Sequence, residues 1–238
     1  KSDNGTVSSL QKIMQRDLST FEGNAQAIRL TAKLQRMNLT YAQTAAILKY
    51  SRSNEQTAIK TLNYIQKKAG FYLSEQNFIN NMWQCVSVTP GHRYPLTYLM
   101  EAADDIAYCL ADIEDAVEKG IIPLNYLIEL LLAAFKAENG EITQPFLGQN
   151  PDDLMSLKDV LQTAYRDSQQ VSINSNQAFF IKIRVPIIHY LVNHAALQFI
   201  EHIEAIYHGD YNQALLEDKS EAHRLLATFK QVGYKHVY

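Results

Sequence analysis

Seven carboxylates lie between residues 101 and 118, and no Lys or Arg interrupts them. They are Glu101, Asp104, Asp105, Asp112, Glu114, Asp115 and Glu118. On an α-helix with 100° per residue, four residues of this segment, mostly acidic, fall within an arc of about 80°. Four apolar residues fall within about 60° on the opposite side. The first set is Asp104, Tyr108, Asp112 and Asp115, and the second is Ile106, Leu110, Ile113 and Val117. The segment therefore predicts one helix with an anionic face and an apolar face.

The anionic face has two explanations. Neighbouring like charges weaken a helix by about 0.2 to 0.5 kcal/mol a pair, so we expect something cationic to offset them. The face is either solvated or binds a hard divalent cation, which prefers oxygen ligands. No histidine is followed by Asp or stands in an HxxxH pattern with Glu; the seven are His92, His189, His194, His202, His208, His223 and His236. A metal site built from this chain alone is therefore incomplete, and His189 and His194 are expected to be core histidines.

Helical periodicity recurs along most of the chain, so we expect helices to position these acids. Apolar residues three and four apart mark residues 10–18, 25–37, 40–48, 96–117, 124–135, 154–165, 179–206 and 222–232. Only 9 Gly and 6 Pro occur. Residues 178–185 could form a strand, but the apolar pattern that continues to residue 200 favours a helix. The sequence predicts an all-α fold with short connections, and a polar, mobile loop at residues 168–176.

Composition narrows the class of protein. The 22 basic and 25 acidic side chains give a net charge of −3. This charge argues against the broad basic surface that is typical of domains that bind nucleic-acid duplexes. Two isolated cysteines fit a reducing compartment, so we expect a cytoplasmic protein. The most apolar stretch, residues 121–135, is interrupted by Asn125 and Glu129, which argues against a membrane span. Because the chain lacks an initial Met, we expect it to be cut from a longer one.

Four motifs occur in the order found in one known family. Residues 100–108 (Met-Glu-Ala-Ala-Asp-Asp-Ile-Ala-Tyr) and 111–116 resemble the late metal-ligand motif of the deoxyguanosine triphosphate triphosphohydrolases, members of the HD phosphohydrolase superfamily. The stretches 21–26, 47–50 and 67–72 are similar to earlier family motifs. Residues 215–218 and 235–238 resemble the family's later helices. The resemblance covers most of the chain and implies an HD-domain-like helical bundle.

The resemblance also implies roles for individual residues. Asp104 matches the aspartate that completes the family's His, His-Asp, Asp metal site. Tyr108 and Asp112 match positions that read the deoxyribose, through packing against C2′ and a bond to the 3′-hydroxyl. Positions near the triphosphate or sugar are matched by Asn24, Lys49, Tyr50 and Lys68. From the residues alone, the lysines could be solvated, Tyr50 could be core packing, and Asn24 could cap a helix.

The chain departs from the family pattern at both ends. The family's first histidine, its His-Asp pair and the following catalytic histidine and glutamate precede the region around Phe21, and none is present. Base-recognising residues that follow Tyr238 in the family are also missing. The resemblance therefore implies that residues 1–238 are the central part of a single HD-type domain, incomplete at both ends. We expect no catalytic residue within the chain and no activity of the fragment alone.

The implied parent is an enzyme that hydrolyses dGTP to deoxyguanosine and tripolyphosphate, with Mn²⁺ or Mg²⁺ acting at the α-phosphate. The family implies a homo-oligomer, typically a hexamer, and single-stranded DNA as a possible effector. Two alternatives stay open. The parent could be an HD-type phosphohydrolase of another nucleotide, because base-reading residues are not visible. The chain could also be a non-catalytic helical regulatory or interaction module.

Overall fold

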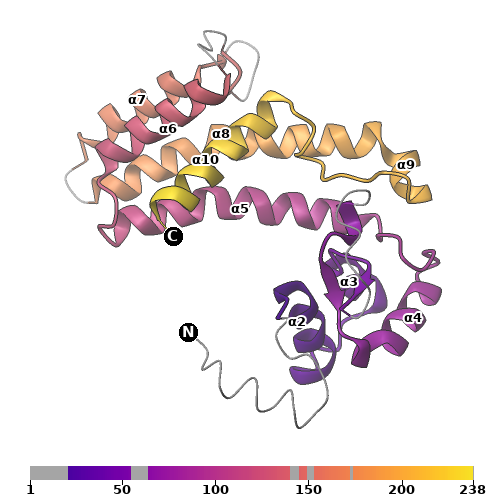
Figure 1. The fold of residues 1–238 in the computed structure, drawn as a ribbon. Helices are drawn as coiled ribbons and strands as arrows, with labels where there is room; N and C mark the ends of the chain where they lie inside the picture. Colours follow the sequence, from indigo (N-terminus) through magenta and orange to yellow (C-terminus); the bar gives the residue numbers. More distant parts are fainter. Residues whose placement is uncertain (1–20, 55–63, 140–144, 149–152, 172–173, 238) are drawn as a thin grey trace. The chain divides into compact units, whose positions relative to one another are not determined.

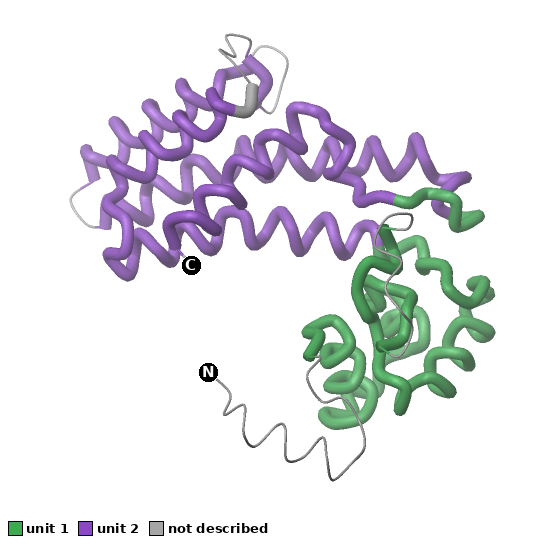
Figure 2. Tube along the Cα trace, in the orientation of Figure 1, with its two compact units in different colours: residues 1–97, 207–212 green, residues 98–206, 213–238 purple. Residues whose placement is uncertain are grey.

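The computed structural model describes residues 21–54, 64–139, 145–148, 153–171 and 174–237 (Figure 1). The helix expected at residues 10–18 lies outside them. The chain separates into two compact units (Figure 2). Unit 1 comprises Lys1–Thr97 and Tyr207–Asn212, and unit 2 comprises Tyr98–Ile206 and Gln213–Tyr238. The expectation of a single HD-type domain over residues 1–238 stays a prediction, and each unit is described by itself.

Unit 1 is built from short elements. In chain order they are α2 (Gly23–Arg29), a π-helical turn η1 (Leu30–Leu34), α3 (Tyr41–Ile47), β1 (Arg52–Ser53), η2 (Tyr64–Gln66), β2 (Ala69–Phe71), η3 (Leu73–Glu75) and α4 (Gln76–Cys85). The helix expected over residues 25–37 is therefore shorter, since the α-helix ends at Arg29. Thr40 explains where α3 begins: its hydroxyl accepts from the backbone N–H of Gln43, whose side chain accepts from the backbone N–H of Thr40.

A two-stranded parallel sheet joins distant parts of unit 1. β1 pairs with β2 so that Arg52 lies opposite Ala69 and Ser53 opposite Phe71. The core beside it consists of buried apolar side chains, namely Ile28, Ala45, Leu48, Phe71, Ile79, Met82 and Trp83. Two strands this short are not stable alone and depend on that core. Helical periodicity could not reveal either strand, and the sequence also missed α4.

Unit 2 contains longer helices and one short helix of six residues. They are α5 (Leu96–Glu118), α6 (Leu124–Asn139), α7 (Leu157–Ser168), α8 (Ser175–Glu201), α9 (Ile203–His208) and α10 (Glu221–His236). Both α6 and α8 contact α10, and α7 packs against α6 and α8. The strand alternative for residues 178–185 is wrong, because these residues lie inside α8. The all-α prediction is confirmed for the described residues, the small sheet apart.

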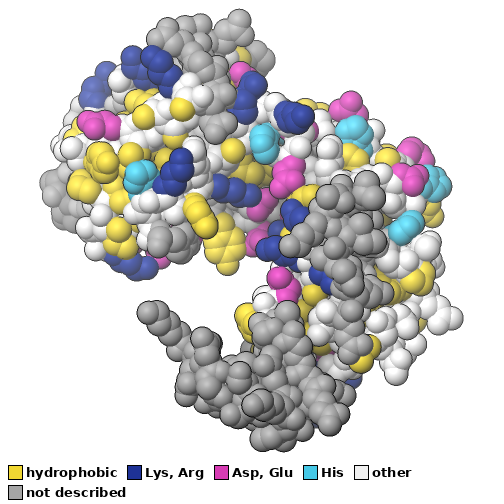
Figure 3. Space-filling model, in the orientation of Figure 1, with side chains coloured by type: hydrophobic (Ala, Val, Ile, Leu, Met, Phe, Trp, Pro, Cys, Tyr) yellow, Lys and Arg dark blue, Asp and Glu magenta, His cyan; other side chains and the backbone are white. Residues whose placement is uncertain are grey.

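The ends of the unit 2 helices carry cap residues. The Ser156 hydroxyl caps α7 and the Ser220 hydroxyl caps α10, each accepting a backbone N–H three residues on. Residues 215–218, expected to belong to a helix, instead form turns ahead of α10. Within the described ranges, no helix has the length and apolar character needed to cross a bilayer. On the face in Figure 3, Lys and Arg are interspersed with Asp and Glu rather than gathered in one basic patch.

Candidate active site

Helix α5 carries Asp104, Tyr108 and Asp112 on one face, as the periodicity predicts. The opposite face is buried: Ile106, Leu110, Ile113 and Val117 are 5%, 2%, 0% and 5% exposed. Burial of these apolar side chains fixes the rotation of the helix, because turning it would expose them. Asp104 and Tyr108 are consequently exposed and Asp112 is half-buried.

Cations from three places offset the acids of α5. Lys230 of α10 lies 2.9 Å from Asp105. Arg184 of α8 is paired with Glu114, which is buried. Lys119, just beyond the helix, pairs with Asp115 at 2.8 Å across exposed side chains. The cation expected from the charge pattern is therefore supplied largely by residues far away in the sequence.

The two adjacent acids at positions 104 and 105 differ in their surroundings. Asp105 is engaged by Lys230, and its side chain is 19% exposed. Within the described part of the chain, no hydrogen bond or ion pair engages the carboxylate of Asp104. An exposed carboxylate without a partner suits a hard divalent cation, which takes oxygen ligands. Asp104, which the resemblance makes a metal ligand, is thus the one of the two acids whose carboxylate has no partner among the described residues.

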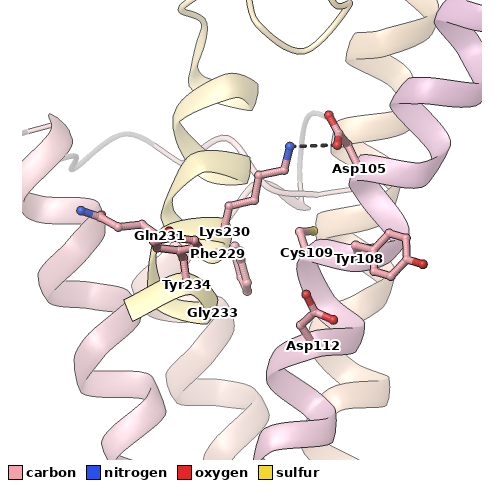
Figure 4. A pocket seen from close by; sticks show the side chains of 9 residues that line it. All are labelled: Asp105, Tyr108, Cys109, Asp112, Phe229, Lys230, Gln231, Gly233 and Tyr234. Atoms are coloured by element: carbon pink, nitrogen blue, oxygen red, sulfur yellow. Dashed lines mark ion pairs between the residues drawn. The ribbon is translucent and has the colours of Figure 1, made fainter. Parts of the chain in front are cut away.

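A pocket of about 600 Å³ opens between α5 and α10. Its lining residues, shown in Figure 4, are Asp105, Tyr108, Cys109, Asp112, Phe229, Lys230, Gln231, Gly233 and Tyr234. The side chains of Asp112 and Cys109 point from α5 towards α10, whereas the Tyr108 ring points away from α10 and lies at the rim (Figure 4). Two candidate residues for the sugar therefore line one partly apolar pocket.

Cys109 forms part of this pocket but has no acid or base role. Burial raises the pKa of its thiol to about 12, and its Sγ donates to the backbone carbonyl of Ile106 at 3.1 Å. The thiol therefore stays protonated near neutral pH and is neither a thiolate ligand nor a nucleophile. Besides this thiol, two carboxylates and the amine of Lys230 line the pocket.

In unit 1, Lys49, Tyr50 and Lys68 are held near one another by a close backbone contact. A Cβ on Gly70 would lie 1.6 Å from the carbonyl oxygen of Tyr50, so only glycine permits this approach. Lys49 and Lys68 each lie within two residues of that contact. Lys49 is half-buried and Lys68 exposed, whereas Tyr50 is 3% exposed and contributes to the core.

Arg93 fixes the backbone of the same segment. Its Nε donates to the carbonyl oxygen of Lys49 at 2.7 Å, and its guanidinium lies over the Tyr64 ring at 5.4 Å. The side chain is almost completely buried. Sequence reasoning missed Arg93 and Lys230. An Arg three residues before the apolar-periodic segment 96–117, or a lone Lys in an amphipathic helix, carries no local signal of its partner.

Asn24 belongs to the start of α2. Its Nδ2 donates to Glu22 Oε1 at 2.6 Å, and Glu22 is the residue that caps the helix. The alternative that Asn24 is the helix cap is therefore wrong. Asn24 stays half-buried at a helix N-terminus, where amide donors favour an anion.

The candidate residues fall into two groups. Asn24, Lys49, Tyr50 and Lys68 lie in unit 1, and Asp104, Tyr108 and Asp112 lie in unit 2. That the two groups face one groove stays a prediction. In the part of the chain that the structure describes, no three His, Cys, Asp or Glu side chains are grouped as metal ligands.

Comparison with known proteins finds several relatives that carry the same name. No protein-family model matches the chain. A "probable deoxyguanosinetriphosphate triphosphohydrolase" of Pseudomonas aeruginosa is 46% identical over 232 residues, which are 96% of this chain and 46% of the relative. The deoxyguanosinetriphosphate triphosphohydrolases of Serratia proteamaculans and Yersinia pestis are each 44% identical over 233 residues, 96% of this chain and 44% of the relative. The chain therefore spans less than half the length of the curated relatives it matches.

Proposed function

We propose that this chain is part of a deoxyguanosinetriphosphate triphosphohydrolase, and that the full-length protein hydrolyses dGTP to deoxyguanosine and tripolyphosphate. The observation that carries the proposal is helix α5. In a chain 46% identical to a relative of that name, this helix carries an unengaged aspartate, Asp104, and, one and two turns further on, Tyr108 and Asp112, which line a pocket. The similarity over 96% of the chain supports the same assignment.

Asp104 is the residue we assign to a divalent cation, Mn²⁺ or Mg²⁺, as one ligand among several. Its exposed carboxylate fits such a cation, and the remaining ligands would come from outside the described residues, among which no three His, Cys, Asp or Glu side chains are grouped. When bound, the cation would polarise the α-phosphate and lower the pKa of the attacking water. The buried apolar face of α5 keeps Asp104 at a fixed height and rotation relative to the pocket.

Tyr108 and Asp112 are assigned to the sugar. A rise of 1.5 Å per residue places them about 6 and 12 Å along the axis from Asp104, the span from an α-phosphate to the far edge of a ribose. The ring of Tyr108 would leave no room for a 2′-hydroxyl. The carboxylate of Asp112 would accept a hydrogen bond from the 3′-hydroxyl.

The residues of unit 1 are assigned to the triphosphate. Lys49 and Lys68 would place ammonium groups, and Asn24 an amide, against a tetra-anionic chain, where charge-assisted bonds are the stronger kind. Tyr50 would act through the backbone contact with Gly70 that holds the lysines, since its side chain is buried.

The experiment measures tripolyphosphate release by the full-length protein from dGTP with Mn²⁺, with the other dNTPs and GTP as competitors. Asp104→Asn should abolish release, because the ligand is lost while the shape is kept. Asp115→Asn is the matched control: it removes an exposed acid eleven residues further along α5, whose partner is Lys119, and should leave the rate within about twofold. Wild-type protein that releases no tripolyphosphate, or equal losses in the two variants, would refute the proposal.

The isolated 238-residue chain should release no tripolyphosphate from dGTP and Mn²⁺. A cation held by one protein ligand is neither tightly bound nor fixed in geometry. The measurement is turnover above a metal-only blank. Turnover abolished by Asp104→Ala would show that the missing ligands are dispensable.

We further propose that the full-length protein is a cytoplasmic homo-oligomer, a hexamer in keeping with the family resemblance, and that single-stranded DNA modulates it. Gel filtration with light scattering tests the oligomeric state, and rates measured with and without an oligonucleotide test the effect of DNA.

A further inference from the structure

Helix α8 carries apolar residues on more than one side. Six of its residues are buried, and at 100° per residue they fall within an arc of about 160°. Both α7 and α10 pack against α8. Beyond the buried arc, however, the helix lacks the charged face that is typical of a surface helix, since no Asp, Glu, Lys or Arg occurs in residues 185–200. A helix of this kind is typical of a buried position, so we expect a further partner to cover it.

A second apolar set runs along the exposed surface of α8. It consists of seven positions that are exposed or half-buried, and we call it the apolar stripe: Ile181, Val185, Ile188, Val192, Ala196, Phe199 and, at the start of α9, Ile203. Three of them, Ile181, Val185 and Val192, are 54%, 51% and 48% exposed. At 100° per residue the stripe occupies an arc of about 80°, and it is about 33 Å long. A contiguous apolar surface of this length is typical of an interaction site.

The spacing of the apolar stripe reads the same in both directions. From residue 181 to residue 203 the steps are four, three, four, four, three and four residues, with Val192 at the centre. A two-fold axis at Val192 would therefore place stripe residues opposite stripe residues along the whole length. Val192 would meet Val192 of a second copy, Ile188 would meet Ala196, and Val185 would meet Phe199. A two-fold interface requires such a self-complementary surface, and steps of four and three are those of paired helices.

Charges near the ends of the stripe favour an antiparallel pair. Lys182 and Arg184 lie near its beginning, and Glu201 and Glu204 lie near its end. Antiparallel packing brings the basic end of one helix to the acidic end of the other, whereas parallel packing would bring like charges together. Both basic residues also have acidic partners within unit 2, so these charges select the direction of packing. The attraction itself comes from burial of the apolar side chains.

We propose that the apolar stripe is an interface between two copies of the protein, in which α8 packs antiparallel against α8 about a two-fold axis at Val192. The inference deepens the proposed function, because it gives the homo-oligomer a specific contact. One helix face is smaller than the roughly 800 Å² that each partner buries in a standard interface, so this contact is one of several in the assembly.

The first measurement is disulfide cross-linking of the full-length protein. At a two-fold axis, a cysteine at position 192 meets its own copy within the Cα separation of about 4.4 to 6.8 Å that a disulfide needs. Val192→Cys should therefore form a covalent dimer under mild oxidation, visible on a non-reducing gel. Leu197→Cys is the matched control, since Leu197 is 64% exposed on the same helix but lies about 140° from the centre of the stripe. Wild type reports any cross-link through the exposed Cys85.

The register of the pair can be tested in the same way. Two copies of residue 185 would lie about 21 Å apart along the helix axis, so Val185→Cys alone should not cross-link. Co-expressed Val185→Cys and Phe199→Cys proteins should form a mixed dimer, because the two-fold axis places these positions opposite each other. A cross-link of Val185→Cys with itself would contradict the antiparallel register.

The second measurement is the assembly state of charged variants. Val192→Glu places two carboxylates against each other at the axis and should raise the Kd of the oligomer at least tenfold, measured by light scattering on dilution. Leu197→Glu should leave this Kd within about twofold. Circular dichroism melting confirms that both variants are folded, and the cross-linking result does not depend on them.

The outcomes separate this inference from dGTP hydrolysis. An oligomeric wild type without a cross-link at position 192, or equal cross-linking at positions 192 and 197, would overturn the interface and leave the hydrolysis as it stands. A monomeric wild type would overturn both the interface and the proposed homo-oligomer. If a thiol reagent fails to reach Cys introduced at position 192 in a monomer, the rest of the full-length chain covers the stripe and the inference is wrong.

Discussion

In unit 2, one helix of 23 residues carries Asp104, Tyr108 and Asp112, whereas in unit 1 the lysines at 49 and 68 depend on strands of two and three residues. The helix sets its own spacing through backbone hydrogen bonds, and its buried face sets its rotation. The lysines are placed by contacts between residues far apart in the chain, such as Gly70 with Tyr50 and Arg93 with Lys49. We therefore expect small changes in the core to leave the candidate residues on α5 in place, and similar changes in unit 1 to displace its lysines.

The largest effect is expected from adding one methyl group in unit 1. Gly70→Ala places a Cβ 1.6 Å from the carbonyl oxygen of Tyr50, so the two backbone segments must separate. We expect a loss of about 3 kcal/mol or more in the free energy of unfolding, measured by urea denaturation of the full-length protein.

Gly23→Ala is the control for that change. No atom lies within 4 Å of the Cβ it would add at the start of α2, so stability should change by less than about 1 kcal/mol. Equal effects of the two substitutions would mean that the contact at Gly70 is not what holds unit 1 together.

Next in size is the loss of one carboxylate from α5. Asp112→Ala should cost about 1 to 3 kcal/mol of transition-state binding, roughly 10- to 100-fold in kcat/KM for dGTP, through the lost bond to the 3′-hydroxyl. The measurement compares dGTP with 2′,3′-dideoxy-GTP and GTP on wild type and variant. An equal loss on the dideoxy substrate would show that Asp112 does not read the 3′-hydroxyl.

Removing one methyl group from the core of unit 2 should matter less. Ile113 is completely buried on the apolar face of α5, and Ile113→Val leaves a small cavity that costs about 1 kcal/mol. Because the helix keeps its register, kcat/KM for dGTP should stay within about twofold. Loss of activity well beyond the loss of stability would contradict the idea that the helix fixes the site by itself.

The smallest effect concerns the cap of α10. Burial acts to raise the pKa of Asp218, but hydrogen bonds from Ser220 and His194 outweigh it and hold the pKa below its usual value. Ionised Asp218 therefore contributes stability above about pH 4, and this contribution is lost as the pH falls through the lowered pKa. Wild type should exceed Asp218→Asn in Tm by about 2 to 4 °C at pH 6, with the difference vanishing near pH 3. A difference that does not depend on pH would contradict the role of the charge.

Much of unit 2 could be predicted because its signals are local. The periodicity over residues 96–117 gave α5 to within one residue at its end, and the same pattern placed α6 and α10. The predicted buried face, Ile106 to Val117, is the observed one. His194, expected in the core, is half-buried, and its Nε2 lies 2.6 Å from Asp218 Oδ2.

By itself the sequence determined the helical class, the register of α5 and, through its resemblance to one family, the candidate roles of Asp104, Tyr108 and Asp112. The pairing of β1 with β2, the glycine contact at Tyr50, and the ion pair of Asp105 with Lys230 were decided only by the tertiary structure. Each of these depends on a partner 17 to 125 residues away. Helix periodicity reports on neighbours three and four residues apart, so it carries no information about which distant backbone or ammonium group will meet a given side chain.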